Sequence, residues 1–228
     1  MKLFKLALAS AVATAALGGA ALAQDTGTVA FNVGVVSDYV FRGLSQTDEN
    51  PALQGGVDFS SGLAYGGIWG SNVDFLDDTS AEIDVYGGIK PTVGAVSLDL
   101  GVIYYGYVDE PKGANYANWE YKAAASVPAG PATLGAAVFY SNDTFGAAGE
   151  ATYLEVNGAV PVGPVLLSGA YGNQEFKGVD DYNLWNIGAA YTFAEKFTLD
   201  VRYYGTDNEA FTGALGDERF VVGLKAAF

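Results

Sequence analysis

Apolar residues occupy alternate positions in the final segment of the chain, and this period of two constrains the fold more than any other feature. One face carries Phe220, Val222, Leu224, Ala226 and Phe228, and the positions between them include Arg219 and Lys225. Side chains of a β-strand point alternately to opposite faces, so the pattern is typical of a strand with one apolar face. The alternation recurs near residues 28–42, 51–60, 63–75, 80–91, 95–108, 116–127, 132–142, 150–160, 165–173, 181–193, 196–206 and 217–228. The sequence therefore predicts an all-β fold of about twelve strands in a single domain.

The connections between these segments are of two kinds. One set is short and rich in Gly or Pro, at residues 60–62, 91–94, 128–131, 161–164 and 194–195. The other set is mostly longer and acidic, at residues 43–50, 76–79, 109–115, 143–149, 174–180 and 207–216. Tight turns on one side and long loops on the other are typical of antiparallel up-and-down β-barrels of outer membranes. With an even number of strands, both termini of the chain lie on the short-turn side of the barrel.

The second face of the strands carries too many charges for a dry interior. A transmembrane barrel with a watery lumen would accommodate them, and so would a secreted β-sandwich with solvated outer faces. Aromatic residues cluster at the strand ends, among them Tyr39 and Phe41 at the loop end of the first segment, as expected at a membrane interface. The chain also ends on Phe228, which resembles the C-terminal signal that the outer-membrane assembly machinery reads. We therefore favour the transmembrane barrel.

The first residues have the pattern of a secretory signal peptide. Lys2 and Lys5 precede an apolar run and the small-residue site at residues 21–23. We predict a signal peptide over residues 1–23, a barrel over residues 24–228, and localisation to the outer membrane of a Gram-negative cell. Without the two leader lysines the formal net charge falls from −15 to −17. So acidic a chain is a poor partner for nucleic acid, whose phosphates require Lys and Arg.

Cysteine and histidine are absent from the chain. Their absence excludes disulfides, thiolate metal sites, Ser-His-Asp triads and histidine-ligated metals. Glu82 and Asp84 share one strand face and could form the carboxylate pair of a glycosidase, but lumen lining is the interpretation that such a strand favours. The acidic pairs at residues 77–78 and 180–181 fit no spaced calcium loop and are interpreted as solvated loop residues. We predict no enzymatic activity, no cofactor and no metal.

Strand parity places nine acidic and six basic residues on the lumen face. They are Asp38, Asp58, Asp74, Glu82, Asp84, Asp99, Glu120, Glu155 and Asp200, against Arg42, Lys90, Lys122, Arg202, Arg219 and Lys225. The excess of acids predicts a weak cation preference if the pore conducts. We predict the following residues to line the pore: Asp38, Arg42, Asp74, Asp84, Asp99, Asp200, Arg202 and Arg219.

Three of these residues, Arg42, Arg202 and Arg219, lie near the loop ends of strands that barrel closure makes neighbours. They could form a cationic ladder that guides anionic solutes at the outer mouth. Alternatively, Arg42 and Arg202 pair with Asp38 and Asp200 and hold the wall together. We favour the pairing.

The segment NVGVVSDYVFRGLSQTDENPALQGGVDFS, followed by YGGIWGSNVDF, covers about residues 32–75. It resembles the hallmark of the TorF-type porins, a proteobacterial family of outer-membrane proteins. The remainder of the chain agrees with that family in length, strand rhythm and terminal Phe. The resemblance implies a porin-like channel, and it transfers no substrate and no catalytic residue.

Together these features predict a porin for passive diffusion of small solutes with a weak preference for cations. The alternative is a non-conducting outer-membrane barrel with a structural or adhesive role. The expected partners are outer-membrane lipid and lipopolysaccharide, the assembly machinery acting on Phe228, and small solutes. Monomer and homo-oligomer both stay open, because lipid-facing and subunit-facing apolar surfaces look alike in a sequence.

Overall fold

The computed structural model describes residues 27–228. The predicted signal peptide and the first residues after it lie outside this range. Among the residues described, no helix is long and apolar enough to cross a membrane.

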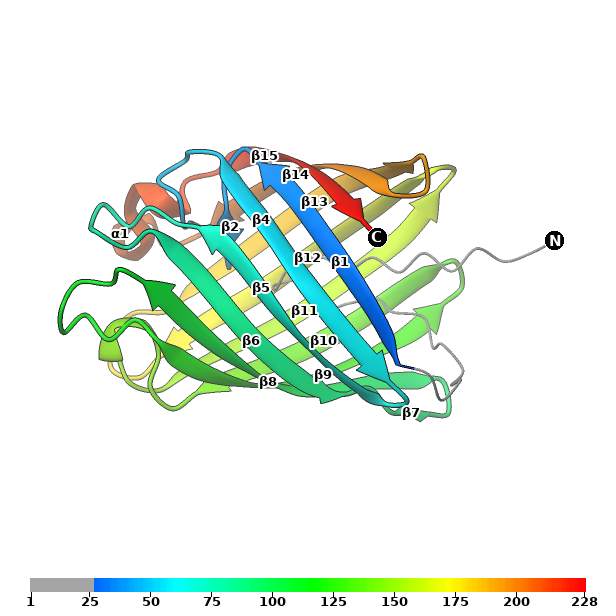
Figure 1. Ribbon diagram of the computed structural model, residues 1–228, viewed down its shortest axis with the longest axis horizontal. Helices are drawn as coiled ribbons and strands as arrows, with labels where there is room; N and C mark the ends of the chain where they lie inside the picture. The colour runs from blue at the N-terminus through cyan, green and yellow to red at the C-terminus, as the bar shows by residue number, and fades with distance from the viewer. Residues whose placement is uncertain (1–26) are drawn as a thin grey trace.

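Thirteen strands form one antiparallel sheet, and the pairing of β6 with β8 closes it into a ring. The two-residue strand β7 (Thr92–Val93) pairs only with β8, so twelve strands make the wall of the barrel (Figure 1). They are β1 (Thr28–Val36), β4 (Ala52–Ser61), β5 (Ala64–Asn72), β6 (Ala81–Ile89), β8 (Val96–Val108), β9 (Asn118–Ala129), β10 (Ala132–Ser141), β11 (Ala151–Val162), β12 (Val165–Phe176), β13 (Tyr182–Phe193), β14 (Phe197–Thr206) and β15 (Arg219–Ala227). The predicted twelve-stranded barrel in a single domain is confirmed.

The seam of the barrel joins the first and last strands. In this seam Asn32 to Val36 of β1 pair with Ala227 to Gly223 of β15. The final residue extends the seam, because Phe31 and Phe228 exchange two backbone hydrogen bonds of 3.0 and 2.9 Å. Among residues 27–228 no strand of the wall is therefore left with an open edge, and the ladder satisfies the backbone groups around the ring.

Alternate residues of each strand face outward and form an apolar belt. On β15, Phe220 is 72% exposed, Val222 46% and Leu224 42%, whereas Val221 between them is 7% exposed. The interior contains the buried polar residues, including Glu82, Asp84 and Glu120. The barrel is thus apolar outside and polar inside, the reverse of a soluble fold.

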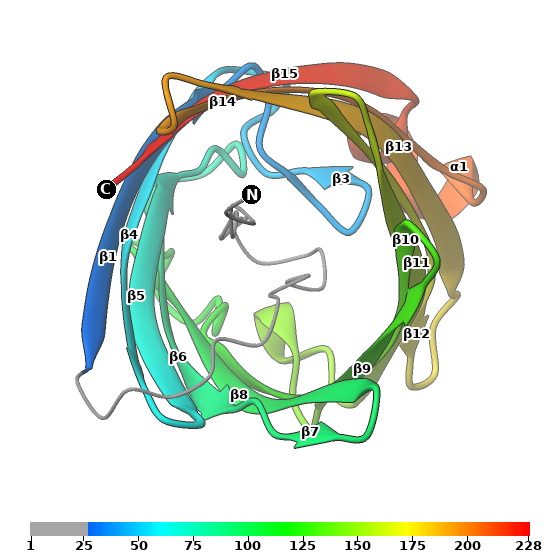
Figure 2. The ribbon, with the colours of Figure 1, turned by 90° about the vertical axis from the view of Figure 1, so that its right-hand side faces the viewer.

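The first segment differs from its prediction. Strand β1 ends at Val36, and residues 37–50 fold into the ring instead of continuing to residue 42 (Figure 2). This inner segment, residues 37–50, contains the short hairpin of β2 (Val40–Phe41) and β3 (Leu44–Ser45). Its turn is formed by Arg42 and Gly43, which have φ values of 47° and 82°.

Tyr39 and Phe41 therefore do not lie at a membrane interface, and that prediction is wrong. Tyr39 is 5% exposed and packs edge-on against Trp69, with ring centroids 5.4 Å apart. Phe41 packs against Tyr105 in the same way at 5.8 Å. The apolar rings are buried against the inner wall, which offers them aromatic partners that a solvated lumen would not.

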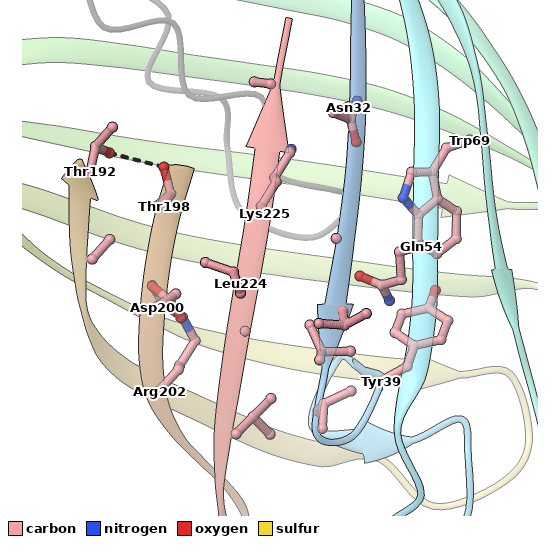
Figure 3. A pocket seen from close by; sticks show the side chains of 18 of the residues that line it. Asn32, Tyr39, Gln54, Trp69, Thr192, Thr198, Asp200, Arg202, Leu224 and Lys225 are labelled. Carbon is pink, nitrogen blue, oxygen red and sulfur yellow. Dashed lines mark hydrogen bonds and ion pairs between the residues drawn. The ribbon is translucent and has the colours of Figure 1, made fainter. Parts of the chain in front are cut away.

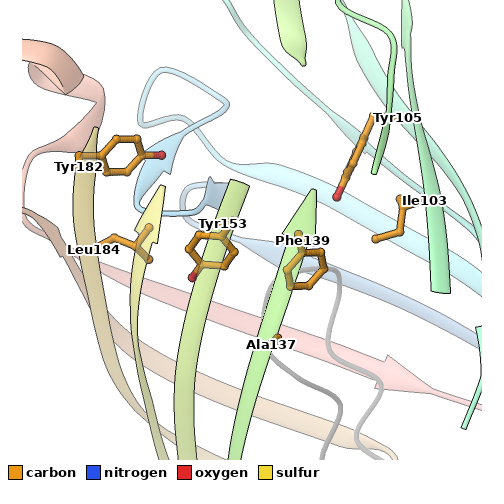
Figure 4. Packing of buried hydrophobic residues seen from close by; sticks show 7 residues of the cluster. All are labelled: Ile103, Tyr105, Ala137, Phe139, Tyr153, Tyr182 and Leu184. Atoms are coloured by element: carbon orange, nitrogen blue, oxygen red, sulfur yellow. The ribbon is translucent and has the colours of Figure 1, made fainter. Parts of the chain in front are cut away.

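One side of the interior is an aromatic cluster on which the inner segment rests. Its buried members come from β8, β10, β11 and β13: Ile103, Tyr105, Ala137, Phe139, Tyr153, Tyr182 and Leu184 (Figure 4). Phe41 and Leu44 of the inner segment pack against it.

The remaining helical elements are short and lie in the long loops. They are η1 (Phe145–Ala147), α1 (Glu209–Thr212) and η2 (Gly213–Gly216). The loop that carries α1 lies at the end of the barrel away from the C-terminus (Figure 1).

Candidate pore and its constriction

Arg42 is the residue that fixes the inner segment to the far wall. Its guanidinium is bidentate on Glu120 of β9, with Nη1–Oε1 and Nη2–Oε2 distances of 2.7 and 2.8 Å. Nη1 also donates to Oε1 of Gln174 on β12 at 3.0 Å, and the Tyr105 hydroxyl donates to Glu120 at 2.9 Å. A fork-to-fork pair of this kind combines strong hydrogen bonds with a fixed orientation.

Aromatic rings complete the site around the Arg42 guanidinium. Its Cζ lies 4.8 Å from the ring centroid of Phe41, 5.1 Å from that of Phe139 and 4.4 Å from that of Tyr153. The Tyr182 hydroxyl donates to the backbone carbonyl of Arg42 at 3.1 Å. Burial is the largest single influence and acts to lower the pKa of Arg42, but Glu120 together with Tyr105 and Tyr153 raises this pKa and the net shift is upward, so Arg42 is a permanent cation.

Asp38 anchors the near end of the inner segment. Its carboxylate accepts hydrogen bonds from the hydroxyls of Ser45 at 2.6 Å and Thr47 at 3.0 Å, which close the segment on itself. Arg219 of β15 donates to the other Asp38 oxygen at 2.8 Å. Arg219 also donates to the carbonyls of Ala214 and Leu215 at 2.8 and 2.9 Å. The inner segment is therefore attached to β15 near its first residue, through Asp38, and to β9 at the tip of its hairpin, through Arg42, and it crosses the lumen between them.

A carboxylate pair on β6 lies beside the inner segment. Glu82 accepts a hydrogen bond of 3.2 Å from the hydroxyl of Tyr39, whose burial raises its pKa well above the ordinary value of 10.0. Asp84 is fully buried beside Glu82, whose carboxyl group lies within hydrogen-bonding range. No N–H or hydroxyl donor among residues 27–228 reaches either Asp84 oxygen. Trp69 on β5 is its cross-strand partner, and the buried Trp69 Nε1 likewise meets no acceptor in this range.

Two further ion-pair groups line the lumen toward the turns. Arg202 pairs with Asp200 at 3.1 Å and donates to Asn186 at 2.7 Å and Ser168 at 2.9 Å. Asp99 accepts from Lys122 at 2.8 Å and from the Tyr65 hydroxyl at 2.7 Å, with Lys90 at 3.9 Å.

The structure places seven of the eight residues predicted to line the pore inside the ring or on the inner segment. The exception is Asp74, which lies beyond the end of β5, is exposed, and accepts the backbone N–H of Leu76 at 3.0 Å. Without Asp74, the interior has eight acidic residues against the same six basic ones.

The predicted arginine pairing is right for one pair and wrong for the other. Arg202 pairs with Asp200 as expected. Arg42 pairs with Glu120, and Asp38 pairs with Arg219 instead. The cause is the inward fold of residues 37–50, which carries Arg42 across the lumen and away from Asp38.

An open cavity of about 990 Å³ lies between the inner segment and the turns (Figure 3). Strands β1, β4, β5, β13, β14 and β15 supply its wall. Its polar lining includes Asn32, Gln54, Asn186, Thr192, Thr198 and Lys225. In residues 27–228, the cavity included, no group of three or more carboxylates is arranged to hold a metal ion.

Fold and interior together define the class: a closed, twelve-stranded antiparallel barrel, apolar outside, with a polar lumen crossed by an inner segment. A family-level comparison matches residues 20–228 to a bacterial protein family of unknown function, Gcw_chp. The chain belongs to this family. That description does not carry the TorF-type name, and a comparison with curated proteins gives no match.

Several solved structures with a similar fold are porins. A KdgM porin in complex with disordered oligogalacturonate has a TM-score of 0.59 at 7% identity, over 89% of this chain and 99% of that one. The NanC porin has a TM-score of 0.57 at 7% identity, over 88% and 99%. The chain spans 62% of the length of another porin, with a TM-score of 0.43 at 17% identity, too low to support an inference. Similarity at this level of identity establishes the fold.

Proposed function

We propose that the protein is a passive channel for small solutes in the outer membrane of a Gram-negative cell, with a weak preference for cations. The observation that carries the proposal is the inversion of the barrel. Large apolar side chains face outward on every side, and ionic groups surround an open cavity inside. Exposed apolar surface on this scale is unfavourable in water and favourable against lipid chains.

The inner segment limits the size of the solute. It crosses the lumen from β15 to β9, and buried ion pairs hold it at Asp38 and at Arg42. A twelve-stranded ring is intermediate between side-chain-filled small barrels and wide porins, so a segment inside it leaves room only for small molecules.

The cation preference follows from the charge of the lumen and the loops. Eight carboxylates against six cations leave an excess of two negative charges, and the long loops are acidic. Fixed charges along a pore concentrate the ions of opposite sign. Asp38, Arg42, Asp84, Asp99, Asp200, Arg202 and Arg219 are the residues we propose to line the path.

Planar-bilayer recording of the purified, folded protein tests this proposal. We expect discrete conductance steps and a reversal potential under a KCl gradient that indicates modest selectivity for K⁺. The same preparation unfolded in urea is the control and should give no steps. A folded protein that gives no steps at any voltage would contradict the channel function.

One observation favours a second candidate, a non-conducting barrel with a structural or adhesive role. The inner segment is bonded to opposite parts of the wall through Asp38 and Arg42, so the segment could close the lumen. A variant in which a short Gly-Ser linker replaces residues 38–49 separates the two functions. A channel conducts in both forms and more in the variant, whereas a closed barrel conducts only in the variant.

The proposal includes the route to the membrane. We propose that residues 1–23 direct export, that Phe228 is read by the outer-membrane assembly machinery, and that lipid and lipopolysaccharide surround the barrel. The exposed side chain of Phe228, 61% accessible at the seam, is consistent with such recognition. We also propose the finer relation to TorF-type porins on the strength of residues 32–75. Their SDYVFRG portion forms the start of the inner segment.

A further inference from the structure

Charge is unevenly distributed along the lumen. Toward the loops there are five carboxylates and two cations: Asp38, Glu82, Asp84, Glu120 and Glu155, with Arg42 and Arg219. Toward the turns there are three carboxylates and four cations: Asp58, Asp99 and Asp200, with Lys90, Lys122, Arg202 and Lys225. The turn side therefore has a net charge of about +1 by this count. The charged residues that line the open cavity itself balance: Asp38, Asp58, Glu195 and Asp200 against Arg42, Lys196, Arg202 and Lys225.

Lys225 is the one lumen cation of the six that forms no ion pair within residues 27–228. The other five cations each form an ion pair with a carboxylate. Within residues 27–228, Lys225 has neither an ion pair nor a side-chain hydrogen bond. Asp58, the carboxylate whose charge acts on Lys225, already accepts the hydroxyl of Tyr86 at 2.5 Å and the amide of Asn32 at 3.5 Å. The ammonium group is thus available inside the cavity (Figure 3).

Neutral hydrogen-bonding groups surround this ammonium group. Thr198 on β14 is the cross-strand partner of Lys225, and its hydroxyl is 2.9 Å from that of Thr192. Asn32 on β1 and Gln54 on β4 line the same cavity on the other side of Lys225 (Figure 3). A volume of about 990 Å³ is at the upper end of the range for small-molecule sites.

We propose that this turn-side cavity binds a small hydroxylated monocarboxylate, such as a sugar acid. The carboxylate accepts a charge-assisted hydrogen bond from Lys225 Nζ, and the hydroxyls bond to Thr198, Asn32 and Gln54. A single negative charge matches the single lumen cation that has no ion pair. A dianion would be repelled by Asp58 and Asp200, which share the cavity. The inference rests on the proposed channel, and this turn-side site is a local exception to the weak cation preference that we propose for the lumen as a whole.

Isothermal titration calorimetry on the detergent-solubilised barrel tests the proposal with D-gluconate as the probe and neutral D-sorbitol beside it. We expect gluconate to bind at millimolar concentration and sorbitol not to bind. Lys225→Gln should weaken gluconate binding about tenfold, the loss expected for one charge-assisted hydrogen bond. Lys225→Arg should restore most of it. Lys177→Gln is the matched control, because it removes one positive charge from an exposed loop pair with Glu150.

Three results would overturn the proposal: no gluconate binding to the native barrel, equal binding by the Lys225→Gln variant, or equal binding of sorbitol. The Lys225→Arg variant keeps the test valid if the Gln variant does not fold. Calorimetry requires no ion flow, so the outcome is independent of the conductance experiment. Binding without conductance contradicts the channel alone, and conductance without binding contradicts this site alone.

Discussion

Arg42 shows what a single buried charge requires of its surroundings. It is 8% exposed, and it is compensated by a bidentate carboxylate, an amide oxygen and three aromatic rings. A guanidinium loses its hydration when it is buried, and only a complete set of partners offsets that loss. Removing one member of such a set leaves the other charge unpaired, which costs more than the pair itself contributes.

Arg42→Gln should therefore destabilise the barrel by about 3–5 kcal/mol, because Glu120 loses its counter-ion. The same change should increase the preference for K⁺, because it frees a carboxylate in the lumen. Urea unfolding and the reversal potential under a KCl gradient measure the two effects. Lys177→Gln, which breaks a solvent-exposed pair, should change stability by less than about 1 kcal/mol. An Arg42→Gln channel with native selectivity would argue against a role for this pair in the pore.

Asp207 offers a pH-dependent test at the loop end of β14. The side-chain amide and the backbone N–H of Asn183 donate to its carboxylate at 2.7 and 2.8 Å and lower its pKa below the ordinary value of 3.8. A depressed pKa contributes stability that is present above the unfolded value and lost as the pH falls through the folded value. Folding should therefore gain from this contact at pH 5–8 and lose it below about pH 3.8.

Asn183→Ala should raise the pKa of Asp207 toward its ordinary value, as followed by NMR titration of the carboxyl carbon. Asn208→Ala is the control, because the Asn208 amide donates to the carbonyl of Asp181 and not to Asp207. An equal shift in both variants would mean that the Asn183 hydrogen bonds do not set this pKa.

Strands and the inner segment differ in how far the sequence predicts them. Alternation is a local signal, so the wall strands are recovered within a few residues of their ends. The same alternation continues from Val35 through Tyr39 and Phe41, and a period of two does not distinguish a longer strand from a hairpin inside the barrel. The turn at Arg42-Gly43 and the hydroxyls of Ser45 and Thr47 were the available signs of a turn-forming segment.

The partners of the inner segment could not be predicted from local pattern. Glu120, Gln174 and Tyr182 lie 78, 132 and 140 residues from Arg42 along the chain. Each occupies an ordinary lumen-facing position on its strand, and nothing in the spacing links it to Arg42. The ion pair between Arg202 and Asp200 on the turn side was easier to predict, because these two residues are neighbours on one face of the same strand.

At the scale of elements, packing inside the barrel requires small residues beneath large aromatic side chains. Gly172 on β12 lies beneath the ring of Tyr153, and a methyl group added there would overlap the ring and its hydroxyl. Gly172→Ala should thus displace Tyr153 from the Arg42 guanidinium and destabilise the barrel by about 1–3 kcal/mol.

Urea unfolding of Gly172→Ala measures this cost. Gly158→Ala on the neighbouring strand is the matched control, because its methyl group would meet the end of the flexible Leu134 side chain at 3.2 Å and the Thr133 backbone oxygen at an ordinary contact distance of 3.6 Å. Equal stabilities of the two variants would contradict the packing role of Gly172.

For the whole molecule, the apolar belt predicts where charge is tolerated. Val156 lies at the middle of β11 and is 59% exposed, and Val179 in the loop after β12 is 57% exposed. Val156→Lys should destabilise the barrel in a lipid bilayer by about 2–4 kcal/mol, because it places a cation at the membrane midplane. Val179→Lys should be nearly neutral. Unfolding in phospholipid vesicles measures both, and equal small effects would mean that the belt does not face lipid.

The attachment of the inner segment to distant strands sets an order of events during biogenesis. Glu120 and Gln174 follow Arg42 by 78 and 132 positions along the chain, and Arg219 follows Asp38 by 181. The seam between β1 and β15 also waits for the final residues of the chain. The inner segment therefore stays in water, with its ionic and aromatic groups unsatisfied, until the wall is nearly finished. Closure of the seam and binding of the inner segment to the wall are then one late step. If the seam closed first, the inner segment could enter the lumen only through the loop end of the barrel.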